Sequence, residues 1–220
     1  MKIARYIDHA ILKPDMTEEE ARRDIALGLK YHVRTVCVQP ANIALALSMC
    51  EGTDTDVCCV LDFPHGAGGA AAKEAAAAEY AALGAFEIDM VMNIGAARSG
   101  RWDVVKDEIE RVVRQAHAKN VPVKVIFETC FLNPEEIAKA TEVSAQAGAD
   151  FVKTSTGFAT GGATVEAVKI MLDAAKGRIK VKASGGIRDY ETAKRYVDMG
   201  VDRLGVGAKG SAAICEEETM

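Results

Sequence analysis

The sequence has no long apolar run, no excess of positive charge and no N-terminal apolar segment. Its 220 residues carry a formal net charge of −5, so no broad positive field favours nucleic acid, and an anionic ligand needs a local site. Residues 1–5 lead into no apolar signal-peptide core, and no apolar run is long enough to cross a bilayer. We therefore expect a cytoplasmic protein with neither a membrane nor a nucleic-acid partner.

Metal-binding and disulfide-forming patterns are missing as well. The six cysteines form no Cys-x-x-Cys motif, and the four histidines do not cluster. Cys37, Cys58 and Cys59 lie inside apolar runs, where a reduced thiol behaves as a small core residue. We predict six unpaired thiols in a reducing compartment, with no metal site.

Short β-branched runs alternate with helical stretches along the whole chain. The predicted strands cover residues 5–8, 34–38, 57–62, 86–92, 121–129, 151–153, 179–183 and 202–206. Helices are predicted from residue 17, over 41–50, 68–83 and 102–119, from 134, over 164–175 and 189–199, and at the end of the chain. Eight such units favour one α/β domain over residues 1–220, a (β/α)8 TIM barrel. An open doubly wound sheet is the alternative, and the lack of a glycine-rich dinucleotide turn counts against it.

Charged residues occupy alternate positions of four neighbouring predicted strands, and residues two apart share a strand face. The set comprises Glu87, Asp89, Lys124, Glu128, Lys153, Lys180 and Lys182. The opposite faces are apolar and suit the surrounding helices, so the charged set must face the barrel interior, which Val, Ile and Leu normally fill. For Glu87 and Lys124 we favour an internal salt bridge. Asp89, Lys153 and Lys182 stand nearer the C-terminal strand ends, where barrel enzymes do their chemistry, and we predict that they are catalytic.

Two buried ammonium groups disfavour each other's charge, and loss of solvation acts in the same direction. One amine of such a pair is expected to be neutral and able to attack a carbonyl, forming a Schiff base. A carboxylate such as Asp89 can then carry protons. This chemistry requires no metal and no other cofactor. The alternative for Lys153 is a structural lysine whose stem packs and whose head reaches solvent.

Glycine-rich turns follow the seventh and eighth predicted strands. Ser184, Gly185 and Gly186 follow the seventh, and Gly205 and Gly207 lie at the end of the eighth. Barrels hold phosphates at this location through backbone N–H groups near the start of a helix. The alternative is two tight turns without a ligand.

A small polar loop, residues 154–157, follows Lys153. We include its Thr156, with Ser184, among the candidate substrate-binding residues.

Seven short motifs run in order along the chain. They are Ile7-Asp8-His9, Val36-Cys37-Val38, Phe63-Pro64-His65-Gly66, Glu87-Ile88-Asp89-Met90-Val91, Lys124-Val125-Ile126-Phe127-Glu128-Thr129, Lys153-Thr154-Ser155-Thr156-Gly157-Phe158 and Lys182-Ala183-Ser184-Gly185-Gly186-Ile187-Arg188. Together they resemble the deoxyribose-phosphate aldolase family. The likeness extends from residue 7 to about residue 207, and the two lysine motifs are its most specific part.

The resemblance implies a class I aldolase on a TIM barrel. Such an enzyme reversibly cleaves 2-deoxy-D-ribose 5-phosphate to D-glyceraldehyde 3-phosphate and acetaldehyde, in deoxynucleoside catabolism. By motif, Lys153 would form the Schiff base, Lys182 would perturb it, and Asp89 would donate and accept protons. The resemblance places Gly185, Gly186 and Gly205 in phosphate-binding loops.

Four positions depart from the family pattern. Gly207 and Ala208 stand where serines are usual, Ala10 stands where threonine is common, and Lys180 replaces a small residue and adds a positive charge beside Lys182. Two alternatives therefore stay open: a class I aldolase for a different or unphosphorylated aldehyde, and a sugar-phosphate-binding barrel without turnover. Both lysines and Asp89 argue against the second. An exposed apolar helix face could also pair two copies, so a homodimer is compatible with the sequence.

Overall fold

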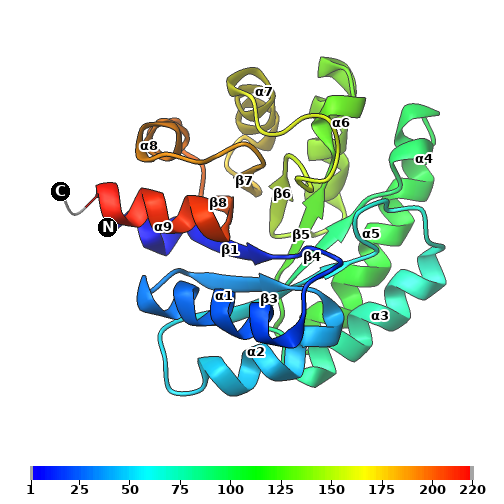
Figure 1. Ribbon diagram of the computed structural model, residues 1–220. Helices are drawn as coiled ribbons and strands as arrows, with labels where there is room; N and C mark the ends of the chain where they lie inside the picture. Colours follow the sequence, from blue (N-terminus) through cyan, green and yellow to red (C-terminus); the bar gives the residue numbers. More distant parts are fainter. Residues whose placement is uncertain (1, 219–220) are drawn as a thin grey trace.

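Eight parallel strands form a closed barrel in the computed structural model, which describes residues 2–218 (Figure 1). They follow one another around the barrel in chain order, and β8 pairs with β1. The strands are β1 (Ile7–Ile11), β2 (Thr35–Val38), β3 (Asp56–Leu61), β4 (Glu87–Val91), β5 (Val123–Ile126), β6 (Phe151–Lys153), β7 (Lys180–Ser184) and β8 (Arg203–Gly207). The predicted (β/α)8 barrel is confirmed. That residues 1–220 form one domain stays a prediction.

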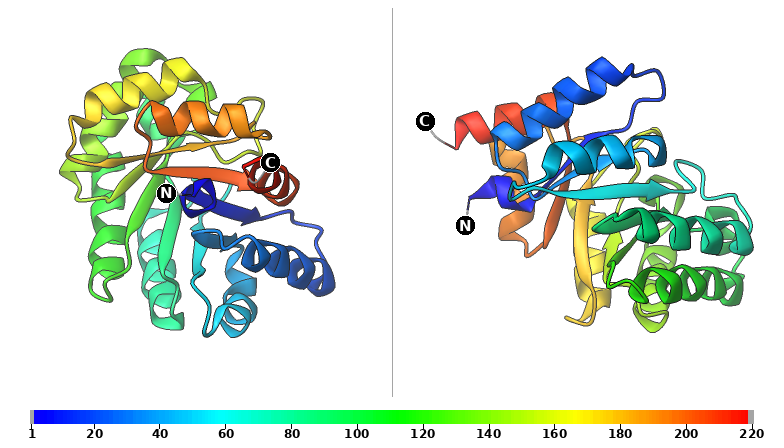
Figure 2. Two further views of the ribbon diagram at one scale, coloured as in Figure 1. Left: turned by 90° about the vertical axis from the view of Figure 1, so that its left-hand side faces the viewer. Right: turned by 90° about the horizontal axis from the view of Figure 1, so that it is seen from below.

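Helices connect the strands and cover the outside of the barrel, as two further views show (Figure 2). They are α1 (Glu18–Lys30), α2 (Ile43–Cys50), α3 (Ala70–Leu83), α4 (Ile94–Arg98), α5 (Trp102–His117), α6 (Pro134–Gln146), α7 (Val165–Ala175), α8 (Tyr190–Asp198) and α9 (Ala208–Glu217). No helix within residues 2–218 is both long and apolar enough to cross a membrane.

Local sequence signals account for several helix ends. Thr17 and Glu20 form a reciprocal capping box at the start of α1, as the Thr-Glu-Glu-Glu run predicts. Asn133 caps α6, and Pro134 occupies its first turn, where a missing N–H has no cost. Gly84 ends α3 with φ +103°, a left-handed conformation that glycine adopts without strain.

Two predicted strand boundaries differ from the structure in ways that matter for the site, and one short helix was not predicted. The first strand begins at Ile7 rather than residue 5, because Ile3–Tyr6 form a 3-10 turn. Strand β5 ends at Ile126, and Glu128 beyond it takes a left-handed φ of +57°, which breaks the strand alternation. The short helix α4 was not predicted, although Asn93 caps it through its side chain.

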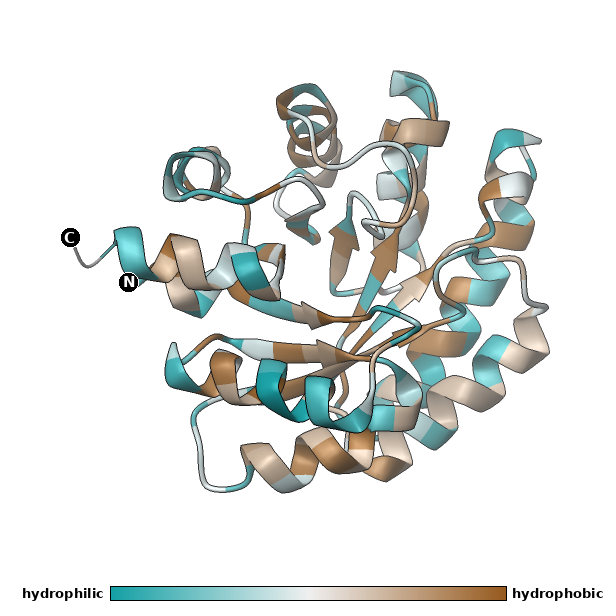
Figure 3. Cartoon of the chain, in the orientation of Figure 1, coloured by the Kyte–Doolittle hydropathy of each residue, from teal (hydrophilic) through white to brown (hydrophobic). Residues whose placement is uncertain are grey.

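The apolar core lies between the barrel and the helices. Ile88, Val125 and Val181 on the outer strand faces are fully buried there, and so are Ile109 and Val112 of α5. Hydropathy colouring shows brown strands inside and teal on the exposed side of α1 (Figure 3). The helix-facing side of the sheet therefore buries the apolar surface, and charged residues remain for the inside of the barrel.

Candidate active site

Three lysines converge on one carboxylate inside the barrel. The Nζ atoms of Lys153 and Lys182 each lie 2.8 Å from Oδ2 of Asp89, and Lys124 Nζ lies 2.8 Å from its Oδ1. Asp89 is fully buried, and the lysine side chains are at most 3% exposed. The period-two pattern brings these side chains together because β4 to β7 are consecutive neighbours in register.

A second set of charges, those of Asp8, Glu87 and Arg203, completes this cluster. Asp8 of β1 binds Lys182 at 2.5 Å and Arg203 of β8 at 2.7 Å. Glu87 binds Lys124 at 2.5 Å and also accepts from both terminal nitrogens of Arg203. The predicted salt bridge between Glu87 and Lys124 is confirmed. Asp8 and Arg203 were not predicted as members of the cluster; Asp8 lies within β1, and Arg203 begins β8.

Opposite charges determine the ionisation of the cluster. Burial opposes charge on Asp89, but the ammonium groups of Lys124, Lys153 and Lys182 outweigh it and hold the pKa of Asp89 well below its ordinary value. Burial likewise opposes charge on Lys182, but Asp8 and Asp89 outweigh it and raise the pKa of Lys182. Asp89 is thus a carboxylate and Lys182 an ammonium ion at neutral pH.

The ring of Phe151 lies below the cluster, at the N-terminal end of the strands. Lys124, Arg203 and Lys180 place their cationic groups 5.7, 5.3 and 5.1 Å from its centroid. Lys180 begins β7 and is exposed, so its long side chain carries the charge to solvent. Lys180 forms none of the ion pairs of the cluster, whose further cations within residues 2–218 are Lys124 and Arg203. That Lys180 adds a charge beside Lys182 stays a prediction.

A cavity of about 740 Å³ opens above the lysines at the C-terminal end of the barrel. Its lining includes eight of the nine predicted site residues: Lys153, Thr156, Lys182, Ser184, Gly185, Gly186, Gly205 and Gly207. The ninth, Asp89, lies beneath the lining and contacts both lysines. The structure therefore places all nine at one site.

The glycine loops form one wall of this cavity. A Cβ on Gly205 would stand 2.3 Å from Ser184 Oγ and 3.2 Å from Lys182 Cε, so only glycine lets β8 approach the lysine so closely. Gly207 is the residue before α9, and it has no side chain to cap the first N–H groups of that helix. Unpaired N–H groups at a helix start attract anions. Arg188 and Lys209, which also line the cavity, add positive charge.

The sequence matches the family model described as DeoC/LacD family aldolase over residues 2–214. The chain belongs to the DeoC/LacD family of aldolases.

Relatives of this aldolase are similar over almost their full length. It is 48% identical to a deoxyribose-phosphate aldolase of Caldanaerobacter subterraneus subsp. tengcongensis, covering 94% of this chain and 90% of the relative. It is 47% identical to one of Clostridium tetani, covering 94% and 96%. A solved structure described as QR15, an aldolase, superposes with a TM-score of 0.92 at 43% identity, covering 99% and 96%. A deoxyribose phosphate aldolase of Aeropyrum pernix, described as having a unique tetrameric structure, has a TM-score of 0.90 at 29% identity, covering 99% and 91%.

One further acidic residue of this DeoC/LacD-family chain lies beside the cavity. Glu128 is 2% exposed and accepts hydrogen bonds from the backbone N–H and the hydroxyl of Thr156. Burial raises the pKa of Glu128, although the bonds from Thr156 and the charge of Lys153 act against it. Glu128 thus anchors the loop that carries Thr156, a role that the sequence pattern missed because the alternation ends at β5.

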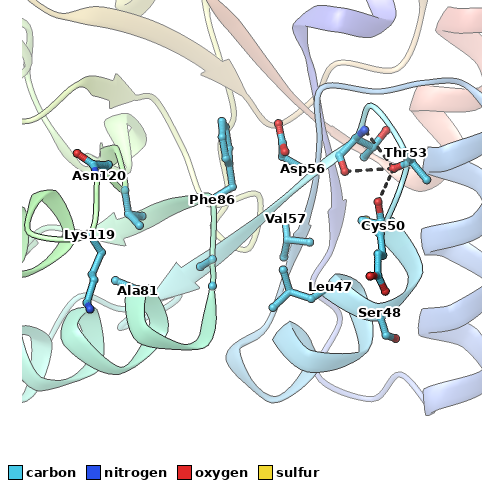
Figure 4. Close-up of a pocket in the computed structure, with 15 residues that line it drawn as sticks. Leu47, Ser48, Cys50, Thr53, Asp56, Val57, Ala81, Phe86, Lys119 and Asn120 are labelled. Carbon is cyan, nitrogen blue, oxygen red and sulfur yellow. Dashed lines mark hydrogen bonds between the residues drawn. The ribbon is translucent and has the colours of Figure 1, made fainter.

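A second cavity of this aldolase, about 620 Å³, lies at the opposite end of the barrel, beside the starts of β3 and β4 (Figure 4). Leu47, Val57, Ala81 and Phe86 form much of it, and Lys119 stands at its edge. None of the described members of the lysine and carboxylate cluster lines it, so we place the site at the other end.

Proposed function

We propose that this chain is a class I aldolase that reversibly cleaves 2-deoxy-D-ribose 5-phosphate to D-glyceraldehyde 3-phosphate and acetaldehyde, through a Schiff base on Lys153. The observation that carries the proposal is one shared carboxylate: Lys153 and Lys182 each approach the same Asp89 oxygen at 2.8 Å, at the bottom of a cavity with glycine loops. The similarity to deoxyribose-phosphate aldolases over 94% of the chain supports this substrate.

The charge balance of the cluster supports Lys153 as the nucleophile. Four cationic side chains, Lys124, Lys153, Lys182 and Arg203, meet three carboxylates, those of Asp8, Glu87 and Asp89, so full ionisation leaves one surplus positive charge. Among the described residues Lys153 has one ion-pair partner, while Lys182 has two and Lys124 three. Loss of the Lys153 proton therefore sacrifices the fewest ion pairs and balances the cluster.

The neutral amine of Lys153 attacks C1 of the open-chain sugar, and loss of water gives the protonated imine. Its positive nitrogen accepts the electron pair of the C2–C3 bond as the C3 hydroxyl loses its proton and D-glyceraldehyde 3-phosphate leaves. The remaining enamine is protonated at C2, and water releases acetaldehyde and the free amine. The Asp89 carboxylate accepts protons, and the Lys182 ammonium group on the same oxygen returns them.

The phosphate group fits the wall made by Gly185, Gly186, Gly205 and Gly207. The first N–H groups of α9 face no side-chain cap, and Arg188 and Lys209 line the same cavity. Gly207 and Ala208 offer no hydroxyl, which favours backbone N–H groups as the ligands. This same observation supports the second candidate, an aldolase for an unphosphorylated aldehyde.

A coupled assay that reduces the released D-glyceraldehyde 3-phosphate with NADH tests the proposal. We expect turnover of 2-deoxy-D-ribose 5-phosphate and loss of turnover in Lys153→Leu, with an unchanged circular dichroism spectrum. For unphosphorylated 2-deoxy-D-ribose, acetaldehyde release is measured instead. A higher kcat/KM for the unphosphorylated sugar would select the second candidate. No turnover of either sugar would favour a sugar-phosphate-binding barrel without activity.

We also propose that the chain acts in the cytoplasm, in deoxynucleoside catabolism, as a homodimer. All six cysteines are free, which suits a reducing compartment. Light scattering on the purified protein tests the assembly, and a tetramer, the state described for the Aeropyrum pernix relative, would replace the dimer.

A further inference from the structure

Two thiols and a carboxylate meet inside the barrel, next to the lysines. Cys37 of β2 and Cys58 of β3 are register partners on adjacent strands. The sulfur atoms of both and an oxygen of Asp89 all lie within 4.8 Å of one another. The Cys58 thiol donates to Asp89 Oδ1 at 3.2 Å. Cys37 also lines the 740 Å³ cavity, so this group is reachable from the site opening.

We propose that Cys37, Cys58 and Asp89 form a binding site for a thiophilic divalent cation such as Zn²⁺ or Cd²⁺. In a tetrahedral zinc site with bonds of about 2.3 Å, two sulfur ligands stand about 3.8 Å apart. The observed separations require shifts of at most about 1 Å to reach that geometry. Three protein ligands leave the fourth position open, and the cavity beside Cys37 supplies room for water there.

The charges around the site permit the exchange of two thiol protons for one divalent cation. Binding releases one proton from each thiol, so one divalent cation replaces two protons and the net charge of the cluster does not change. Lys124 Nζ lies 3.5 Å from Cys58 Sγ and can donate to the thiolate that forms. The cluster described above therefore keeps its charge balance when the metal binds.

A metal at this position inhibits the proposed reaction, a consequence that rests on the proposed function. It takes up the carboxylate of Asp89, which the mechanism uses as the proton acceptor. It also occupies the edge of the cavity beside Cys37. The binding itself does not depend on the aldolase activity, so the two claims are separable.

Cadmium binding to the full chain tests the site directly. The exposed thiol of Cys130 is removed first, as Cys130→Ser, so that surface binding does not interfere. We expect one Cd²⁺ per chain, an ultraviolet thiolate-to-cadmium absorption band, two protons released per metal in weak buffer, and reversal by EDTA. Cys58→Ser and, separately, Cys37→Ser should weaken binding by more than roughly 100-fold, since loss of even an outer-shell partner costs up to that much.

Cys59→Ser is the matched control. Cys59 neighbours Cys58 on β3 and is equally buried, but it belongs to the apolar core outside the barrel. We expect it to bind Cd²⁺ like the Cys130→Ser parent. Equal Cd²⁺ binding by the Cys58, Cys37 and Cys59 variants, or Cd²⁺ binding without proton release, contradicts the proposed site. If Cys58→Ser does not fold, the Cd²⁺ affinity of Cys37→Ser, a variant at the cavity edge, decides whether the site exists. Metal binding without inhibition of turnover contradicts only the inhibitory consequence.

Discussion

Replacing Lys182 by methionine removes one ammonium group from the buried cluster and keeps most of the side-chain volume. The wild-type cluster has four cations for three carboxylates, so one lysine is better neutral. Lys182→Met leaves three cations for three carboxylates. Lys153 then pairs with Asp89 without a second ammonium group on the same oxygen, and we expect a weaker nucleophile although Lys153 itself is unchanged.

The size of this effect follows from the geometry. The Nζ atoms of Lys153 and Lys182 share one oxygen at 2.8 Å each, so they lie close to one another. Two unit charges about 5 Å apart repel by about 3 kcal/mol at an effective dielectric constant of about 20. Because about 1.4 kcal/mol is a factor of ten, loss of an interaction of this size should slow attack by the Lys153 amine roughly 100-fold in the variant.

Imine formation with acetaldehyde, trapped by borohydride at neutral pH, measures the rate of this attack. We expect the trapping rate to fall roughly 100-fold in Lys182→Met. A second substitution gives the control: Asp8 binds Lys182 and Arg203 rather than Lys153. Asp8→Asn in the Lys182→Met background restores a surplus positive charge and should recover part of the rate. An unchanged rate in Lys182→Met, or a loss that Asp8→Asn does not relieve, would refute the charge-balance argument.

Three further predictions concern stability, measured by urea unfolding. Gly205→Ala places a Cβ 2.3 Å from Ser184 Oγ and should lower the free energy of unfolding by about 1–3 kcal/mol. Gly207→Ala, with open space around its Cβ, should lower it far less. Equal losses would contradict the close approach of β8. Lys124→Met leaves Asp89 and Glu87 short of a buried partner and should lower the free energy of unfolding by about 3–5 kcal/mol. Lys139→Met, in the exposed pair with Glu142, should lower it by at most about 1 kcal/mol. Similar losses in the two variants would argue against a buried network. Burial lowers the pKa of His9, so the unfolded chain binds the proton first as the pH falls below 6.5. The free energy of unfolding should therefore decrease below that pH. A His9→Gln variant with the same decrease would show that another group is responsible.

Much of the site could be predicted from the sequence because strand alternation and glycine turns are local signals. A lysine at the end of a short apolar run, as at Lys153, already indicates an inward charge. The period of two places Asp89 and Lys182 on the same side once the strands are neighbours. The turns at Gly185 and Gly205 follow from the same strand ends.

The rest depends on long-range closure or on backbone changes that leave no local trace. Asp8 and Arg203 join the cluster only because β1 and β8 close the barrel. Glu128 reaches Thr156 because its left-handed backbone ends the alternation of β5. Lys180 obeys the alternation, but its place at the first residue of β7 lets its side chain reach water.

Borohydride reduction of the wild-type protein with 2-deoxy-D-ribose 5-phosphate or acetaldehyde, followed by peptide mass mapping, tests the central claim most directly. We predict one covalent adduct, on Lys153, and no adduct in Lys153→Leu. An adduct on Lys182 or Lys124, or no adduct under conditions of turnover, would contradict the assignment of Lys153 as the Schiff-base lysine.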